Sequence, residues 1–197
     1  MINKILTLVL SVSILSLFAF TTHPEKSNAN KKNSSIIWTG SKPASSHTGN
    51  VTLKDGYLSF DHGQLIGGEF TMDMTSIVCT DLEPDKGGNK LVNHLKNEDF
   101  FDVNQFPEAK LIINKVRNIK GSEFEMNGNM TIKGITKPVI FNADIKINKN
   151  SYTAIAKLII DRTEWGIEYS SKKILGSLAD KFIYDDIEFD IFLVSEK

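Results

Sequence analysis

The sequence predicts an all-β fold, an antiparallel barrel of eight strands with one short helix and a capping loop. Apolar and polar residues alternate with a period of two over most of the chain, and turns rich in glycine, proline and asparagine separate the alternating runs. About eight runs can be counted, which is the number that closes a small barrel and leaves no exposed strand edge. A sandwich of two sheets is the alternative, because the same patterning occurs there.

The N-terminal segment, residues 1–29, is predicted to be a secretory signal peptide. A lysine precedes an apolar stretch over residues 5–20, and polar residues follow, with Ser27 and Ala29 as small residues among them. This is the usual order of charged start, apolar middle and cleavage region. We expect cleavage after Ala29, with a site nearer Thr21 as the alternative. A periplasmic or secreted domain, residues 30–197, then remains without an integral membrane span. A permanent anchor is the rival interpretation, but the apolar run is short for a span of about 20 residues.

The composition is that of an ordinary globular protein. The chain has 197 residues with a formal net charge of −1, and 41% of its residues are hydrophobic. This balance gives no indication of a basic surface for nucleic acid. Cys79 is the single cysteine, so no internal disulfide can form and the core must hold the fold by itself. We expect Cys79 to pack in or beside a strand.

The strands are clearest in the second half of the chain. Apolar residues alternate with polar ones over residues 123–133, 139–148 and 152–160, and again over residues 187–193. Such alternation is what a sheet with one dry and one wet face requires.

Turn residues predict how the strands are connected. Asp55-Gly56 tolerates the positive φ angles of a tight hairpin, so we expect a turn there. Gly67-Gly68 suggests a bulge or a sharp bend at a corner of the barrel. Pro138 follows a glycine-containing connection and is expected at the start of a strand, where it costs no ladder hydrogen bond.

Two segments depart from the strand pattern. Residues 89–101 place apolar side chains at nearly helical spacing, which predicts one short helix followed by an aromatic-rich loop. Residues 163–181 form a second irregular insertion, for which we expect a helical turn.

Three strings of residues resemble one family. They are HLKNEDFFDV at 94–103 followed by Phe106-Pro107, GNMTIKGITKPV at 128–139, and IDRTEWGI at 160–167. In this order and spacing the chain resembles the YceI-like family of periplasmic proteins, from about Trp38 to Val194. The resemblance implies an extended, lipocalin-like barrel with a helix over it. It also implies binding of a polyisoprenoid or related long amphiphile, with no catalytic activity. Residues 38–49 depart from the common pattern, which leaves the identity of the ligand open.

The candidate ligand-binding residues are apolar side chains on the inward face and near the helix. Methionine is well suited to line such a cavity, because its unbranched side chain fits irregular shapes. An ordinary packed core is the alternative for all of them. Both tryptophans could equally lie at an entrance, with the indole N–H near water, or serve as core anchors. The predicted set is Trp38, Phe70, Met72, Met74, Leu91, Leu95, Phe100, Phe101, Phe106, Met126, Met130, Phe141, Ile160 and Trp165.

Charged side chains offer fewer candidates. Arg162 is the candidate contact for a ligand head group, although a structural ion pair or hydrogen bond beside Asp161 is the favoured interpretation. His94 and Glu98 share a helical face but lack the further donors of a metal site, so we expect no metal.

The sequence therefore predicts a lipid-binding protein that acts as a carrier or buffer. The expected partner is a long-chain lipid such as a polyisoprenoid, an isoprenoid quinone or a fatty-acid-like amphiphile, with no other cofactor, and a homodimer is left open. No common enzyme motif occurs in the sequence. Two alternatives remain, namely an envelope stress or interaction protein with a filled barrel, and a small-molecule enzyme that uses the cavity.

Overall fold

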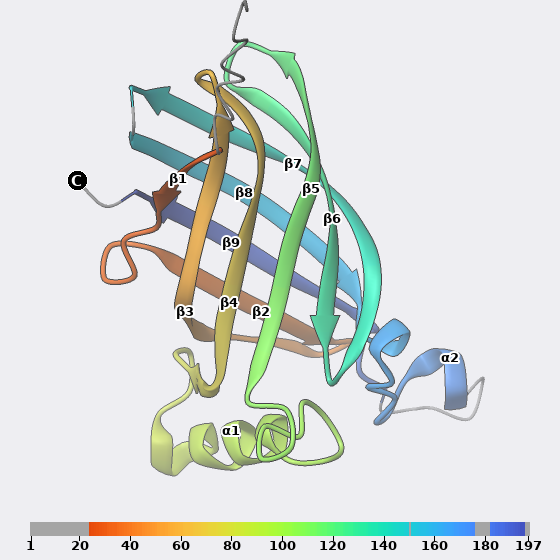
Figure 1. The fold of residues 1–197 in the computed structure, drawn as a ribbon. Coiled ribbons are helices and arrows are strands. Elements are labelled where there is room, and N and C mark those ends of the chain that lie inside the picture. Colours follow the sequence, from red (N-terminus) through yellow and green to blue (C-terminus); the bar gives the residue numbers. More distant parts are fainter. Residues whose placement is uncertain (1–23, 150, 176–181, 196–197) are drawn as a thin grey trace, which may run out of the picture.

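The computed structural model describes residues 24–149, 151–175 and 182–195, which form an antiparallel barrel with a short helix at one end (Figure 1). The apolar stretch of the predicted signal peptide lies outside these residues. The strands of the described part are β1 (Glu25–Asn28), β2 (Ser35–Lys42), β3 (Ser45–Asp61), β4 (Gln64–Cys79), β5 (Glu108–Lys120), β6 (Glu123–Ile132), β7 (Ile135–Asn148), β8 (Ser151–Asp161) and β9 (Asp186–Val194). Its helical elements are the 3-10 turns η1 (Pro84–Lys86) and η2 (Arg162–Trp165) and the α-helices α1 (Gly88–Lys96) and α2 (Lys172–Leu175).

Eight strands close the barrel. They are neighbours in the order β3-β2-β9-β8-β7-β6-β5-β4, and β4 also pairs with β3, which completes the ring. All of these pairings are antiparallel. β1 is an addition that pairs with residues 57–60 of β3, beyond the part of β3 that β2 occupies. The predicted eight-stranded barrel is confirmed, and the two-sheet alternative is wrong.

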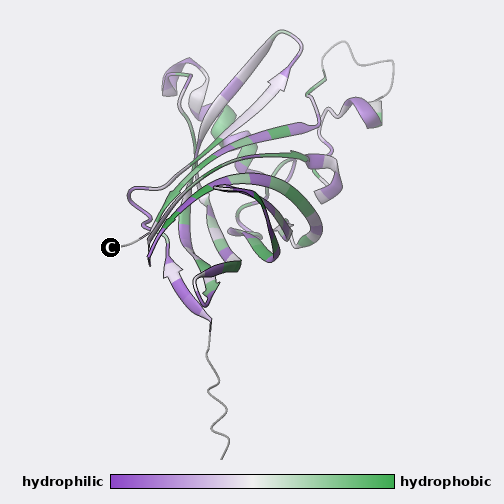
Figure 2. Cartoon of the chain, turned by 90° about the horizontal axis from the view of Figure 1, so that it is seen from above, coloured by the Kyte–Doolittle hydropathy of each residue, from purple (hydrophilic) through white to green (hydrophobic). Residues whose placement is uncertain are grey.

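Burial follows the predicted alternation. Along β6 every second residue is buried, from Phe124 to Ile132, and the residues between them are partly or fully exposed. Seen from above, apolar and polar positions alternate along the strands of the barrel (Figure 2). The apolar positions therefore point inward and form the core.

The hairpin predicted at Asp55-Gly56 is wrong. These residues lie inside the single long strand β3, at a register shift between Leu53 and Asp55. Gly56 is required there by packing, because a Cβ atom would lie 2.3 Å from Cδ1 of Phe70. The hairpin that joins β3 to β4 is instead at His62-Gly63, with φ angles of 48° and 77°, which is typical of a type I′ turn.

The bend predicted at Gly67-Gly68 is confirmed. The register of β3 against β4 shifts beside Gly67, between Ser59 and Phe60. A Cβ atom on Gly67 would lie 2.6 Å from the carbonyl oxygen of Ile113, and one on Gly68 would lie 2.7 Å from that of Tyr57. Glycine thus allows the backbones to approach closely where the sheet bends.

Pro138 lies inside a strand rather than at its start. The preceding turn is Lys133-Gly134, with φ angles of 48° and 73°, and β7 begins directly after it. Pro138 lies opposite Asn129 of β6. Residues 135–142 of β7 have no partner in the pairing with β8, so the missing N–H can face a side without a ladder.

The helical segments agree with the prediction in place and in type. α1 lies across one end of the barrel (Figure 1), and the loop after it buries Phe100 and Phe101. The second insertion contains η2 and α2. Its residues 176–181 lie outside the described part of the chain.

Candidate functional site

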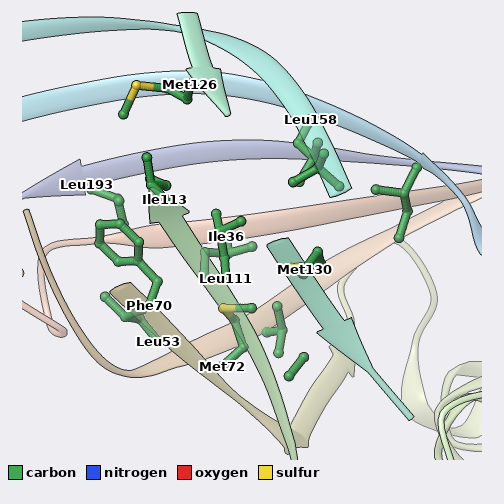
Figure 3. Packing of buried hydrophobic residues seen from close by; sticks show 14 of the residues in the cluster. Ile36, Leu53, Phe70, Met72, Leu111, Ile113, Met126, Met130, Leu158 and Leu193 are labelled. Carbon is green, nitrogen blue, oxygen red and sulfur yellow. The ribbon is translucent and has the colours of Figure 1, made fainter. Parts of the chain in front are cut away.

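The barrel interior contains an apolar cavity with a volume of about 280 Å³. This is close to the lower end of the range for ligand pockets, about 300–1,000 Å³. All eight strands of the barrel contribute side chains to its lining. Figure 3 shows part of this interior, where Ile36 of β2, Met72 of β4 and Leu158 of β8 point inward. The interior is therefore not filled by side chains, which contradicts the filled-barrel alternative.

Most of the predicted site residues line this cavity. The four methionines contribute from β4 and β6, and Phe141 contributes from β7. Their role in binding a ligand remains a prediction, while their place in the wall is observed. The predicted residues in the lining are Trp38, Phe70, Met72, Met74, Leu91, Leu95, Phe100, Phe101, Met126, Met130 and Phe141.

Three predicted residues lie outside the lining. Phe106 packs over the turn before β7, where a Cβ atom on Gly134 would lie 3.0 Å from its ring. Ile160 and Trp165 are buried but border a separate groove on the barrel wall. The Trp165 indole N–H donates to the carbonyl oxygen of Met130 at 3.1 Å. The sequence pattern identified these three as apolar and buried or half-buried, but not that they lie beside the cavity rather than in its lining.

Trp38 is an anchor in the wall rather than an entrance residue. Its side chain is buried, and a Cβ atom on Gly49 would lie 2.6 Å from its ring. Its indole N–H is buried without a hydrogen-bond partner among the described residues. The alternative that places this N–H near water is therefore wrong.

The polar part of the lining lies at the end of the cavity where the β2–β3 hairpin is found. Lys42, Ser45 and His47 come from this hairpin, and Tyr184 lies just before β9. His47 pairs with Asp81, which follows β4 and precedes η1 and α1, so α1 covers the same end. We call this end the mouth of the cavity.

Arg162 is a structural residue at this site. Its side chain is 1% exposed and donates hydrogen bonds to the carbonyl oxygens of Ile167 (2.7 Å), Ile183 (3.2 Å) and Tyr184 (3.3 Å). Its ion pair is with Asp185 at 3.3 Å, whereas Asp161 caps η2 by accepting from Thr163. Four of its five N–H groups are thereby used. The structural interpretation agrees with the geometry, although with a partner other than the one expected.

His94 pairs with Asp99 at 3.0 Å rather than with Glu98. Its ring also makes edge contacts with Phe100 and Tyr169. Among the described residues, no group of three His, Cys, Asp or Glu side chains could hold a metal ion. In the same part of the chain, no helix is long and apolar enough to cross a bilayer.

A hydrogen-bonded cluster around Asp81 connects β3 and β4 at the mouth. The Asp81 carboxylate accepts from Cys79 Sγ (3.1 Å) and from the Thr48 N–H (3.0 Å), and it contacts His47 Nδ1 at 2.9 Å. Partial burial by itself raises the pKa of Asp81, but these hydrogen bonds together outweigh it and lower the pKa to about 2. Burial raises the pKa of the Cys79 thiol, which favours the unreactive form.

The Asp81 cluster predicts a loss of stability in acid. The carboxylate stabilises the fold above its ordinary pKa of 3.8, and this contribution disappears as the pH falls toward 2. We expect Asp81→Asn to lower the free energy of unfolding by less than about 1 kcal/mol at neutral pH, since the group is partly exposed. Urea unfolding from pH 6 to pH 2 should show that the parent and Asp81→Asn become equally stable as the pH falls below about 4.

Asp85→Asn, at an exposed position of η1, is the control. If Asp81→Asn were still less stable than the parent by the full amount at pH 2, the assignment would be contradicted.

Sequence reasoning missed the residues that create the empty space. Ala143 of β7 and Ala154 and Ala156 of β8 line the cavity, and Ala143 lies directly opposite Ala156. Small side chains on the inward face of two neighbouring strands leave room that larger ones would fill. The alternation predicts that these alanines point inward. Whether they leave a cavity depends on the side chains across the barrel, which the alternation does not give.

The profile of the YceI-like domain matches residues 23–194, which is nearly the whole described structure. The chain belongs to the YceI-like domain family. The resemblance drawn from its three sequence strings is therefore confirmed.

Curated relatives share short stretches with this YceI-like chain. A UPF0312 protein of Photorhabdus laumondii is 33% identical over 75 residues, which are 38% of this chain and 35% of that protein. One of Pseudomonas savastanoi is 29% identical over 91 residues, 45% of this chain and 44% of its own length. The chain thus aligns with less than half the length of these relatives.

Solved structures share the fold at low sequence identity. BcnA of Burkholderia cenocepacia has a TM-score of 0.69 at 17% identity, over 85% of this chain and 99% of that one. A polyisoprenoid binding domain from Saccharophagus degradans has a TM-score of 0.65 at 13% identity, over 88% and 99%. The YceI protein of Campylobacter jejuni has a TM-score of 0.54 at 18% identity, over 99% and 94%.

Proposed function

We propose that this protein binds the apolar tail of one long-chain lipid inside its barrel, as a carrier or buffer. The observation that carries the proposal is the cavity itself, which is lined almost wholly by apolar side chains and has its polar residues at the mouth. Such a site fits an amphiphile with its tail inside and its head group near Lys42, Ser45 and Tyr184. A structural neighbour named as a polyisoprenoid binding domain supports this ligand class.

The volume of the cavity limits the length of the tail. A water-sized group takes up about 30 Å³ of a liquid, and a methylene group is of similar size, so a cavity of 280 Å³ encloses roughly ten carbon groups. This corresponds to about two isoprene units of the tail. At about 0.8 kcal/mol per buried methylene, the enclosed segment gains roughly 8 kcal/mol before the entropic cost of association.

Binding rather than catalysis is proposed because of what faces the cavity. Arg162 is the most buried charged side chain of the described lining, and its donors are used by backbone carbonyls and Asp185. A reaction site needs titratable groups that face each other across the substrate. Lys42 and His47 lie at the mouth, away from the apolar interior.

Export to the periplasm or the cell exterior is part of the proposal. β1 begins at Glu25, and Ala29 is 3% exposed in the core, with its N–H donating to the carbonyl oxygen of Gly56. Cleavage after Ala29 would remove β1, whereas cleavage near Thr21 would retain it. We therefore favour the site near Thr21, and N-terminal sequencing of the exported protein tests it.

Mass spectrometry of a solvent extract from gently purified protein tests the function directly. We expect a long-chain isoprenoid or fatty amphiphile at close to one molecule per chain. Finding no lipid, together with no uptake of added isoprenoid alcohol or quinone, would overturn the proposal.

A series of amphiphiles with one head group and tails of increasing length gives a quantitative test. Each added methylene should tighten Kd about fourfold, because 0.8 kcal/mol corresponds to that factor. The gain should stop at roughly ten carbon groups, where the cavity is full. Isothermal titration calorimetry measures both the slope and the end of the series. An affinity independent of tail length would show that the tail binds outside the cavity.

A further inference from the structure

One seam of the barrel is closed by side chains instead of backbone hydrogen bonds. β7 and β8 pair only from Ala143 opposite Ala156 to Asn148 opposite Ser151. Beyond this point, residues 135–142 pair with β6 alone and residues 157–161 with β9 alone. Two strand edges therefore face each other without a ladder over the part of the wall nearest η2.

A groove lies over this seam and meets the cavity at one side chain. Val139 and Ile140 of β7 and Ile159 and Ile160 of β8 line the groove. Leu158 lines both the groove and the cavity. The Leu158 side chain is thus part of the partition between the lumen and the outside.

The elements that close the seam are few. Trp165 of η2 borders the groove and is held by its hydrogen bond to the Met130 carbonyl oxygen at 3.1 Å. Lys137 of β7 and Glu164 of η2 form an ion pair at 3.3 Å across the same region, with both side chains largely exposed. An exposed pair of this kind contributes little stability. Pro138 has no N–H that could donate a ladder hydrogen bond from β7 to β8.

The outer rim of the seam carries two exposed apolar side chains beside the charged Lys137, Asp161 and Glu164. Ile140 is 68% exposed and Ile159 is 53% exposed, and they lie on the two facing edges. Extending the register of β7 and β8 places them opposite each other. These two isoleucines and the apolar partition behind them give a hydrocarbon chain a path along the seam.

We propose that the β7–β8 seam is a lateral gate through which the lipid tail passes sideways between the cavity and a lipid surface. This inference rests on the proposed function. Sideways passage keeps the tail beside the apolar side chains of the seam and the adjoining lipid surface, whereas entry through the mouth would expose most of it to water on the way. Displacement of Leu158 and Trp165 opens the path without breaking a strand ladder, which elsewhere in the wall would leave backbone groups unpaired.

A cross-link across the seam tests the gate. The parent protein carries Cys79→Ser, and the test variant adds Ile140→Cys and Ile159→Cys. A short bifunctional thiol-reactive reagent joins the two new cysteines. Both isoleucine side chains are exposed, so the substitutions leave the core intact. The matched control is Lys146→Cys with Thr153→Cys, a pair on the hydrogen-bonded part of the same strands. The probe is radiolabelled geranylgeraniol in phosphatidylcholine vesicles, and its transfer to and from the protein is measured over time.

The expected result is a rate of transfer at least tenfold lower for the linked Ile140–Ile159 variant, in both directions. Its Kd after long incubation should change less than twofold, and the linked control should transfer at the rate of the parent. Equal rates for the two linked proteins would overturn the gate and leave binding through the mouth. If the unlinked parent takes up no lipid at all, the proposed function fails, and the gate fails with it.

Discussion

Replacing Ala156 with phenylalanine is expected to weaken lipid binding more than a hundredfold while the barrel stays folded. Ala156 points into the cavity from β8 and remains half-exposed because the space beside it is empty. A phenyl ring there takes the place of roughly four methylene groups of the tail. At about 0.8 kcal/mol each, the loss is about 3 kcal/mol, which exceeds a factor of one hundred in Kd.

The fold should tolerate this ring because it enters an existing void. Overpacking costs arise when a side chain is forced into a filled core. Here the neighbouring residue on the adjacent strand, Ala143, is equally small. In the tail-length series, Ala156→Phe should also end the gain in affinity at a shorter tail. Titration calorimetry and thermal unfolding measure both effects.

Ile155→Phe is the matched control for Ala156→Phe. Ile155 is the preceding residue on the same strand, points outward and is 57% exposed. Its substitution should leave Kd unchanged. Equal affinities for the two variants would show that the tail does not occupy the cavity.

The sequence predicted the fold well because the barrel follows from local alternation. Every second residue of β6 is buried as the period of two requires, and the methionines of β4 and β6 line the interior for the same reason. The bend at Gly67-Gly68 could also be predicted, because few residues other than glycine allow such close backbone contacts.

The errors come from contacts that are distant in the sequence. Asp55-Gly56 has the composition of a turn, yet Gly56 is a glycine because Phe70 of the next strand packs against it. Arg162 bonds to a segment about 20 residues later, whereas its sequence neighbour Asp161 caps η2. Whether Trp165 lines the cavity or the neighbouring groove likewise depends on where β7 and β8 separate, which no local pattern records.

Replacing Arg162 with methionine is expected to destabilise the protein by about 3–5 kcal/mol, the usual cost of breaking a buried ion pair by removing one partner. The substitution leaves Asp185, whose side chain is 11% exposed, without its cation. It also leaves the carbonyl oxygens of Ile167 and Ile183 without their donor. For a chain of this size, the melting temperature should fall by roughly 6–20 °C.

Lysine at position 162 should not restore stability, because an ammonium group cannot reproduce the planar fork that reaches three carbonyls and a carboxylate. Adding Asp185→Asn to Arg162→Met should recover part of the loss, since the uncompensated buried charge is then removed. A double-mutant cycle from urea unfolding measures this coupling.

Arg117→Met is the control that separates burial from charge. Arg117 pairs with Glu125 at 2.7 Å through a bidentate contact, but its side chain is 58% exposed. Its loss should therefore cost less than about 1 kcal/mol. If Arg162→Met were as mild as Arg117→Met and instead weakened binding of anionic lipids selectively, Arg162 would be a head-group contact. The hydrogen bonds argue for the large loss of stability, because two of the three carbonyls, those of Ile183 and Tyr184, tie η2 to the segment before β9.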